Sequence, residues 1–298
     1  MDRMAQLAEV ITRYAPAAGM HRTAVPRLSL FRADEPTVPT PSVYDASLCL
    51  IAQGAKSVAI AEQELFYDAA HYLVVSVDLP LVGRVTEASA DAPYLCCKID
   101  LDLPALVDMV IAEGGPGKPP PAPALAVYPG DPDLIDAACR LVRLLDRPES
   151  IPALAPLIER ELLYRLLAGP HGGALRHLAV ADSRLGQVSR AVARIRDRFR
   201  DQLRIRDIAA AAGMSESSLH EHFKAVTRTT PLEYQKQLRL QEARRLMLAK
   251  GLSAGAAGFA VGYDSPSQFS REYRRLFGAP PRQDVDRLSH QQNFLGAV

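Results

Sequence analysis

The spacing of hydrophobic residues changes along this chain, and each change marks a different kind of secondary structure. Residues 4–14 place apolar side chains three or four positions apart, which predicts an amphipathic helix. Residues 25–41 are proline-rich and have no regular period, so we expect an extended arm or loop there. Between residues 47 and 101, short β-branched runs are broken by Gly, Pro and Asp, which predicts several closely spaced strands in a small barrel or sandwich.

Helical spacing returns after residues 113–123, a segment too rich in proline and glycine to be a helix or a central strand. Two amphipathic helices are predicted over residues 132–145 and 152–168, and such adjacent helices are typical of a lid or an oligomer interface. We therefore expect a domain boundary near residues 170–183. The predicted domains are residues 1–175 and residues 183–298.

The composition is that of an ordinary globular protein, with 48% hydrophobic, 23% charged and 6% aromatic residues. No apolar run approaches the length that a membrane-spanning helix needs. The first residues carry acids and an amphipathic spacing instead of the pattern of a signal peptide. We therefore expect a cytoplasmic protein with no membrane partner.

The net charge of +1 conceals two halves of opposite sign. Residues 182–298 contain 20 Lys and Arg against 12 Asp and Glu, a net charge of +8. Residues 1–181 contain 15 basic and 22 acidic residues, a net charge of −7. A basic C-terminal third predicts a polyanion-binding module joined to a second domain, with a solvated helical surface as the alternative.

The cysteines have neither metal-ligand spacing nor the density of a disulfide scaffold. We predict that they are reduced thiols in the core or on strands. Neighbours on a strand point to opposite faces, which argues against a redox pair at Cys96 and Cys97. The four cysteines are Cys49, Cys96, Cys97 and Cys139.

A helix-turn-helix pattern occurs in "RIRDIAAAAGMSESSLHEHFKAV", residues 204–226. Gly213 supplies the tight turn between two helices, and Ser215 can cap the second helix. The inward set of that helix is Leu219, Phe223 and Val226. Its two histidines, at positions 220 and 222, cannot converge on one metal ion.

The pattern returns 49 residues later, where Gly262 takes the place of Gly213. Between the two units, Thr230 predicts the N-cap of a long helix that ends at Gly251. A helix of roughly 18 residues would span about 27 Å. Two tandem units tied by one helix are a stronger signal than either unit alone. The inward set of the second unit is Phe269, Tyr273 and Leu276.

Helical geometry at 100° per residue separates an outward face from the inward set in each unit. The outward residues of the first unit are Ser217, His220, Glu221 and Lys224. Those of the second unit are Ser267, Gln268, Arg271, Arg274 and Arg275. Hydrogen-bonding side chains on an outward helix face suit the base edges of the major groove.

Residues 183–288 resemble the DNA-binding domain of the AraC-type transcription regulators. The resemblance is carried by "AGMSESSLHEHFK", "PLEYQKQLRLQEARRLM" and "VGYDSPSQFSREYRRLFGAPP". It implies a monomeric domain of seven helices whose two recognition helices enter adjacent major-groove segments of double-stranded promoter DNA. Such segments lie ~34 Å apart, and the linking helix is of the right order to enforce that spacing. Arg228 stands where the family often has glycine.

The resemblance assigns roles to the outward residues by their position. Base contacts are implied for Ser217, His220, Glu221, Ser267, Gln268 and Arg271. Phosphate contacts are expected for Lys224, Arg274 and Arg275, and Ser270 belongs to the same DNA-binding set. Arg271 is the strongest candidate for base readout, because a bidentate contact to guanine discriminates by about 1–3 kcal/mol.

The N-terminal half resembles the cupin-like sensor domain of the same regulators. The resemblance is carried by "SVYDASLCLIAQGAKSVAI", "FYDAAHYLVVSVDLPLVGRVTEAS" and "RELLYRLLAG". It implies an α+β chain, with an N-terminal cupin-like β-barrel and flanking helices followed by an all-α domain. The implied partners are a small-molecule effector, a second copy of the chain and RNA polymerase. Candidate effector-binding residues are Tyr44, Gln53, Tyr67 and Tyr72, although such residues are more often simply packed.

Cupin enzymes hold a metal ion with clustered histidines and a glutamate. The N-terminal half has only His21, His71, His171 and His177, with no such cluster. We therefore expect no metal, no cofactor and no catalytic residue. The leading hypothesis is a one-component regulator whose sensor half biases DNA binding by the other half. Two alternatives stay open, namely a DNA-binding protein whose barrel only dimerises and a cupin enzyme with a DNA-tethering domain.

Overall fold

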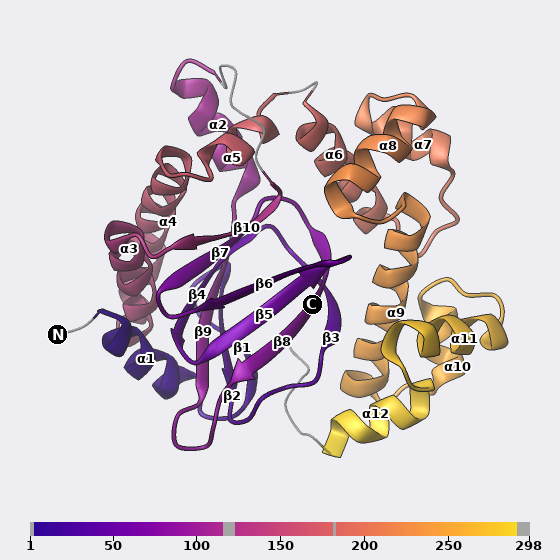
Figure 1. Ribbon diagram of the computed structural model, residues 1–298, viewed down its shortest axis with the longest axis horizontal. Helices are drawn as coiled ribbons and strands as arrows, with labels where there is room; N and C mark the ends of the chain where they lie inside the picture. The colour runs from indigo at the N-terminus through magenta and orange to yellow at the C-terminus, as the bar shows by residue number, and fades with distance from the viewer. Residues whose placement is uncertain (1–2, 116–122, 181–182, 291–298) are drawn as a thin grey trace.

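The computed structural model describes residues 3–115, 123–180 and 183–290. A β-rich N-terminal domain lies between two groups of helices, and the C-terminal helices follow one side of it (Figure 1). The strands are β1 (Gly19–Arg22), β2 (Leu28–Ala33), β3 (Thr40–Tyr44), β4 (Ser47–Gln53), β5 (Ala55–Ile60), β6 (Gln63–Asp68), β7 (His71–Val75), β8 (Leu79–Glu87), β9 (Tyr94–Asp100) and β10 (Leu125–Pro129).

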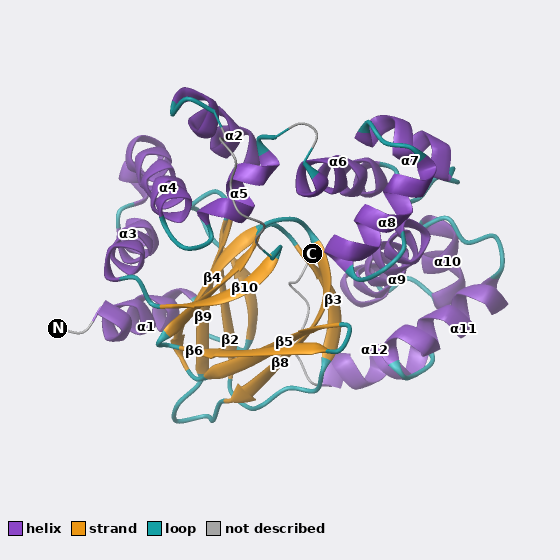
Figure 2. Cartoon of the chain, turned by 45° about the horizontal axis from the view of Figure 1, so that its top comes forward, coloured by secondary structure: helices purple, strands orange, loops and turns teal. Residues whose placement is uncertain are grey.

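The strands form two antiparallel sheets that face each other (Figure 2). The larger sheet has the order β1-β2-β9-β4-β7-β10, and the smaller has the order β3-β8-β5-β6. The strands thus form two sheets instead of one continuous closed sheet. The predicted fold class is confirmed, because a cupin-like antiparallel β domain precedes an all-helical region.

Five helices accompany the sheets within the described residues. They are α1 (Arg3–Tyr14), α2 (Leu103–Ala112), α3 (Pro132–Arg143), α4 (Ile151–Ala168) and α5 (Gly172–Leu178), with two 3₁₀ turns at Leu144–Asp146 and Pro148–Ser150. The helices predicted at the chain start and over residues 132–145 and 152–168 are confirmed. No described helix is both long enough and apolar enough to cross a membrane.

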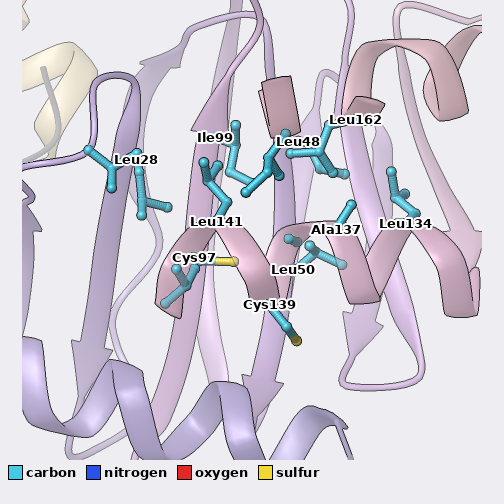
Figure 3. Close-up of a cluster of buried hydrophobic side chains, with 14 of the residues drawn as sticks. Leu28, Leu48, Leu50, Cys97, Ile99, Leu134, Ala137, Cys139, Leu141 and Leu162 are labelled. Atoms are coloured by element: carbon cyan, nitrogen blue, oxygen red, sulfur yellow. The ribbon is translucent and has the colours of Figure 1, made fainter. Parts of the chain in front are cut away.

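The core of the N-terminal domain has two layers, because both faces of the larger sheet are buried. On one face, Cys97 and Ile99 of β9 pack against α3 and α4, together with leucines of β2 and β4 (Figure 3). On the other face, Cys96 of β9 and Ile51 of β4 pack toward the smaller sheet. Cys96 and Cys97 therefore point to opposite faces, and all four cysteines are buried thiols, as predicted.

The second layer continues into the C-terminal region. Val58 and Leu81 of the smaller sheet belong to the same buried cluster as Val188, Ile208 and Tyr234 of the helical region. The seven helices of residues 183–290 are α6 (Arg184–Asp197), α7 (Ile205–Ala212), α8 (Glu216–Thr227), α9 (Pro231–Lys250), α10 (Ala254–Ala260), α11 (Pro266–Phe277) and α12 (Pro281–His290). The described residues therefore contain the seven helices that were predicted. Side chains of the two halves pack against each other at their boundary.

The prediction of an irregular arm at residues 25–41 is wrong in part. Strand β2 and the first residues of β3 lie within that segment. β3 is an edge strand, and Pro41 pairs with Val82 of β8. Proline has no backbone N–H to donate, but an edge strand makes ladder hydrogen bonds on one side only, so proline is tolerated there. The predicted linker at residues 113–123 lies mostly outside the described residues, apart from its ends.

Candidate functional site

The first helix-turn-helix unit is formed by α7 and α8. Gly213 closes α7 in the left-handed region, with φ of 69°, which glycine adopts without a steric penalty. The hydroxyl of Ser215 accepts a hydrogen bond from the Ser218 amide at 3.2 Å and caps α8. Leu219 and Phe223 are fully buried, as predicted, while the predicted inward residue Val226 is only half-buried. The turn, the cap and the core contact therefore follow the sequence pattern.

The second unit, α10 and α11, repeats this geometry. Gly262 has φ of 92°, and a Cβ there would lie 2.2 Å from the Arg200 carbonyl oxygen, so only glycine fits. A Cβ on Gly258 would lie 3.1 Å from the Phe269 ring, which explains glycine inside α10. Phe269 and Tyr273 are fully buried, whereas Phe277 lies in the core where Leu276 was predicted.

Helix α9 links the two units and has 20 residues, so it spans about 30 Å at 1.5 Å per residue. Its N-cap is Thr230, whose hydroxyl accepts from the Glu233 amide at 3.2 Å. Arg239 donates to the carbonyl oxygens of Phe199 at 2.6 Å and Gly262 at 2.8 Å. One guanidinium thus joins the loop after α6 to the turn of the second unit. These bonds fix the orientation of the two units relative to α9.

Arg228, at the end of α8, adopts a left-handed conformation with φ of 59°. The family often has glycine at this position, and glycine adopts this conformation at no steric cost. The backbone N–H of Arg228 still bonds the Lys224 carbonyl oxygen at 3.0 Å. The end of α8 therefore has the left-handed conformation and the capping hydrogen bond with arginine in place of glycine.

The structure places all ten predicted DNA-binding side chains on the exposed surface of α8 and α11. These residues are Ser217, His220, Glu221, Lys224, Ser267, Gln268, Ser270, Arg271, Arg274 and Arg275. Arg275 lies 3.3 Å from Glu233, and Gln268 bonds Glu272 at 3.2 Å. Among the described residues, Arg271 and Arg274 have no ion-pair partner, so their guanidinium groups are free to meet an external anion.

A cavity of about 410 Å³ lies between the two sheets of the N-terminal domain. Its apolar lining comes from both sheets and from the segment before β2: Val25, Leu28, Phe31, Val43 and Val85. Cys49 and Cys96 add thiols, and the charged residues of the lining are Lys56, Lys98, Asp45, Asp100, Arg22, Arg27 and Arg84. The volume falls in the range of small-molecule sites, roughly 300–1,000 Å³.

Two of the four predicted effector residues, Tyr44 and Tyr67, line this cavity. Tyr72 lies on the helix-facing side of the larger sheet, where its hydroxyl oxygen is 3.2 Å from His171 Nδ1. Gln53 lies at the end of β4 and donates to the Pro93 carbonyl oxygen at 2.8 Å. Tyr44 and Tyr67 thus line the cavity, whereas Tyr72 and Gln53 do not.

The Tyr72 and His171 pair is part of a buried aromatic cluster beside α5. The His171 ring lies 5.6 Å from the Tyr72 ring and 5.1 Å from the Tyr128 ring. Burial lowers the pKa of His171 to about 4 and raises the pKa of Tyr72 to about 12. Both side chains are therefore neutral at pH 7, and they act as packing groups at the start of α5.

A series of ion pairs connects the cavity lining to α6 of the C-terminal helical region. Lys98 Nζ lies 3.2 Å from Asp45 Oδ2, and Arg196 Nη1 of α6 lies 2.6 Å from Asp45 Oδ1. The same Arg196 nitrogen also contacts Asp78. Burial alone would raise the pKa of Asp45, but the charges of Lys98 and Arg196 hold it below its usual value. Asp45 is therefore ionised at neutral pH and shared between the two halves.

Sequence reasoning did not select Lys56, Lys98 or Asp45. The signal for one of them is present in β9, where "YLCCKID" alternates between the two layers. A lysine at an inward position of a buried strand marks a polar site. The described residues contain no group of three or more His, Cys, Asp or Glu side chains that could hold a metal ion.

Two family descriptions match the chain. Residues 24–174 match the AraC-type transcriptional regulator N-terminus, and residues 208–287 match a helix-turn-helix domain. The transcriptional activator NphR from Rhodococcus sp is 43% identical over 75 residues, which are 25% of this chain and 22% of NphR. The activator RhaS from Escherichia fergusonii is 30% identical over 146 residues, 47% of this chain and 51% of RhaS.

Solved structures agree with the fold. ToxT from Vibrio cholerae O395 superimposes with a TM-score of 0.57 at 11% identity, over 88% of this chain and 97% of ToxT. ToxT from strain SCE256 with a bound unsaturated fatty acid superimposes with a TM-score of 0.54 at 11% identity, over 88% of this chain and 95% of ToxT. At this level of identity the likeness concerns the fold alone.

A sheet domain with an internal cavity, followed by two tandem helix-turn-helix units, defines the class of a two-domain DNA-binding protein. The N-terminal family match covers more than half of the chain. This chain belongs to the family of AraC-type transcriptional regulators. It matches no more than about half the length of NphR and RhaS, so the activity and partners of the whole protein are treated below as proposals.

Proposed function

We propose that this chain is a sequence-specific DNA-binding transcription regulator, with α8 and α11 as its recognition helices. The observation that carries the proposal is the exposure of every predicted outward side chain on both helices, while Leu219, Phe223, Phe269 and Tyr273 on the opposite faces are buried. The net charge of +8 over residues 182–298 supports it, because a basic surface attracts the phosphate backbone. The proposal keeps the division into residues 1–175 and 183–298.

Base readout is assigned to Ser217, His220, Glu221, Ser267, Gln268 and Arg271. Phosphate contact is assigned to Lys224, Ser270, Arg274 and Arg275. Arg271 is exposed and has no ion-pair partner among the described residues, so binding to guanine breaks no existing salt bridge. A bidentate contact of this kind contributes specificity in addition to affinity.

Arg271→Ala is expected to reduce discrimination between the target and other duplexes by about 1–3 kcal/mol, roughly 5- to 150-fold. The target is first selected from random duplexes with the wild-type chain. Affinities for that duplex and for a scrambled duplex are then measured by fluorescence anisotropy at one salt concentration. The alanine variant should lose its sequence preference at the base pairs that α11 contacts.

Arg274→Ala is the matched control, because it removes the same charge from the same helix at a position assigned to phosphate. It should weaken binding to both duplexes alike and leave the ratio of affinities unchanged. Equal affinity of the wild-type chain for selected and scrambled duplexes would contradict sequence-specific recognition. Transcription from the selected site with purified RNA polymerase then tests polymerase as the proposed partner.

The N-terminal cavity is proposed as the effector site, with Tyr44 and Tyr67 among its lining residues. An effector that prefers one arrangement of the two halves shifts the population that can bind DNA. The cavity shares Asp45 with the contact to Arg196 of α6, so occupancy of the cavity has a direct route to the DNA-binding half. No catalytic role is assigned to any residue.

A homodimer is proposed through an apolar patch on α4 and α2. Half of the eight exposed large hydrophobic side chains of the described residues lie on these two helices, namely Ile111, Leu154, Leu157 and Tyr164. Leu157 and Tyr164 border a shallow hollow with Met109 of α2 and Arg160. An exposed apolar patch of this kind on a soluble chain is typical of an isologous contact between two copies.

Leu157→Asp is expected to convert the dimer to a monomer, because a charge would be buried at the centre of the patch. Light scattering after size-exclusion chromatography measures the mass of both proteins at equal concentration. Leu232→Asp is the control, since Leu232 is exposed on α9, far along the chain from the patch. A wild-type chain that is monomeric at tens of micromolar would rule out this interface.

A further inference from the structure

The cavity between the sheets contains two lysines in different electrostatic situations. Lys98 lies 2.5 Å from Asp100 and 3.2 Å from Asp45, so its charge is balanced. Lys56 has no ion-pair partner among the described residues. Its ammonium lies 5.1 Å from the centre of the Tyr44 ring and 5.7 Å from that of Phe31. Ring faces attract a cation but do not neutralise it.

Neighbouring groups supply no negative charge to Lys56. Burial raises the pKa of Cys96 to about 12 and also raises the pKa of Cys49, so both thiols are neutral at pH 7. Two buried tyrosine hydroxyls on the same cavity, those of Tyr67 and Tyr94, lie close to each other and to the Cys96 thiol. Tyr67 faces Lys56 directly across the β5–β6 ladder. This end of the cavity thus combines the Lys56 ammonium with neutral hydroxyl and thiol groups, and no described carboxylate pairs with that ammonium.

Gly83 of β8, two residues from the strand partner of Lys56, keeps this arrangement in place. A Cβ on Gly83 would lie 2.3 Å from the Tyr44 hydroxyl oxygen and 3.3 Å from Lys56 Cε. A side chain at this position would displace both residues. Glycine at position 83 therefore leaves room for a tyrosine and a lysine side by side within the cavity. Apolar side chains at this place would avoid the free-energy cost of removing polar groups from water.

We propose that the cavity binds an organic monocarboxylate, with its carboxylate between Lys56 and the hydroxyls of Tyr67 and Tyr94, and with its apolar body against Phe31 and Val85. The inference rests on the proposed function, since it gives the chemical class of that effector. The Lys56 ammonium has no carboxylate partner among the described residues, whereas Lys98 and Arg27 of the same lining each have two. A buried cation is stabilised when a ligand supplies both its counter-ion and its hydrogen bonds.

The test uses the full-length chain and pairs of probes that differ only in charge. Octanoate, benzoate and 4-phenylbutyrate are each compared with their primary amides by isothermal titration calorimetry. At least one acid is expected to bind about 10- to 100-fold more tightly than its amide, the range for a hydrogen bond to a charged group. Equal affinity of every acid and its amide, or binding of none of the acids, would overturn the proposal.

Lys56→Met removes the charge and keeps the length of the side chain. It should lose the preference for the acid, whereas Lys56→Arg should keep it. The ligand-free Lys56→Met chain should melt at or above the wild-type temperature, because an unbalanced charge is gone. Unchanged acid affinity in the Met variant would overturn the proposal. The DNA selection with ligand-free protein is independent of these results, so a failure of the acid to bind is distinguishable from a failure of DNA recognition.

Discussion

Asp284→Ala is expected to destabilise the second helix-turn-helix unit by about 3–5 kcal/mol, the cost of leaving a buried charge without its partner. Asp284 lies on α12 and has no exposed surface. Its carboxylate lies 2.6 Å from Arg287 Nη2 and 2.9 Å from Arg244 Nε. It also accepts a hydrogen bond from the Tyr273 hydroxyl at 2.8 Å. One carboxylate therefore joins α9, α11 and α12.

The loss reaches the recognition helix through Tyr273 and Arg244. Tyr273 is a fully buried residue of α11, and alanine at position 284 would leave its hydroxyl without an acceptor. Arg244 is 12% exposed and would lose its carboxylate partner, while its contact with the Phe277 ring, whose centre lies 4.3 Å away, would remain. Helix α11 would then lose its fixed position over the core. The proposed contact of α11 with DNA would be lost as well.

Hydrogen–deuterium exchange of the full-length chain measures this effect locally, because it reports each helix separately. Faster exchange is expected in α11 and α12, with little change in α7 and α8. Asp264→Ala is the control, since Asp264 is an exposed carboxylate in the turn before α11. Unchanged protection of α11 in the Asp284 variant would show that the buried carboxylate does not hold this unit together.

The two helix-turn-helix units could be predicted from the sequence because their determinants are local. Gly213 and Gly262 mark turns that need a positive φ, and Ser215 marks an N-cap that the structure contains. Each lies within a few residues of the helix that it shapes. Asp284 was not selected, because its partners on α9 and α11 lie up to 40 residues away and no periodic pattern connects them.

The strands of residues 25–41 were missed because proline was taken as evidence against a strand. At a sheet edge one side of the strand makes no ladder bonds, so the rule that excludes proline from a central strand does not hold for β3. The alternation in β2 is visible in retrospect, since Leu28 and Leu30 face the helices. Edge position depends on the order of strands in the sheet, which is a property of the whole fold.

The cavity residues show a second limit of sequence reasoning. Both faces of the larger sheet are buried, so alternation separates two sets of residues but does not say which set lines a cavity. Tyr72 of β7 faces the helices, while Tyr67 of β6 faces the cavity. Five positions separate them in the sequence. The choice between them depends on the packing of α3 and α4 against one face.

The contact between the two halves gives the last prediction. Arg196 of α6 contacts Asp45 and Asp78. Asp45 lies just before β4, and Asp78 lies just before β8. The interface also includes a hydrogen bond from the Val43 amide to Gln241 Oε1 of α9, at 2.9 Å. Asp45 belongs to the cavity lining and Arg196 to the C-terminal half, so this ion pair directly connects the proposed effector site to the half that contains the recognition helices.

Arg196→Met is expected to lower the free energy of unfolding by about 2–3 kcal/mol, less than for a fully buried pair because the side chain of Arg196 is 37% exposed. Asp45 and Asp78 would remain at the interface without their shared cation. The response of DNA affinity to a bound carboxylate, a coupling of about 1–3 kcal/mol in typical allosteric proteins, should be lost. DNA affinity with and without the carboxylate, measured by anisotropy on the selected duplex, gives this coupling directly.

Arg198→Met is the matched control for this prediction. Arg198 follows α6 directly, and its partner Asp201, at 2.7 Å, belongs to the same half of the chain. It should therefore leave the coupling intact. Asp45→Asn combined with Arg196→Met should cost less than the sum of the two single changes, because both remove the same ion pair. Full coupling in the Arg196 variant would mean that the effector acts through the apolar boundary around Tyr234, and not through the charged contact.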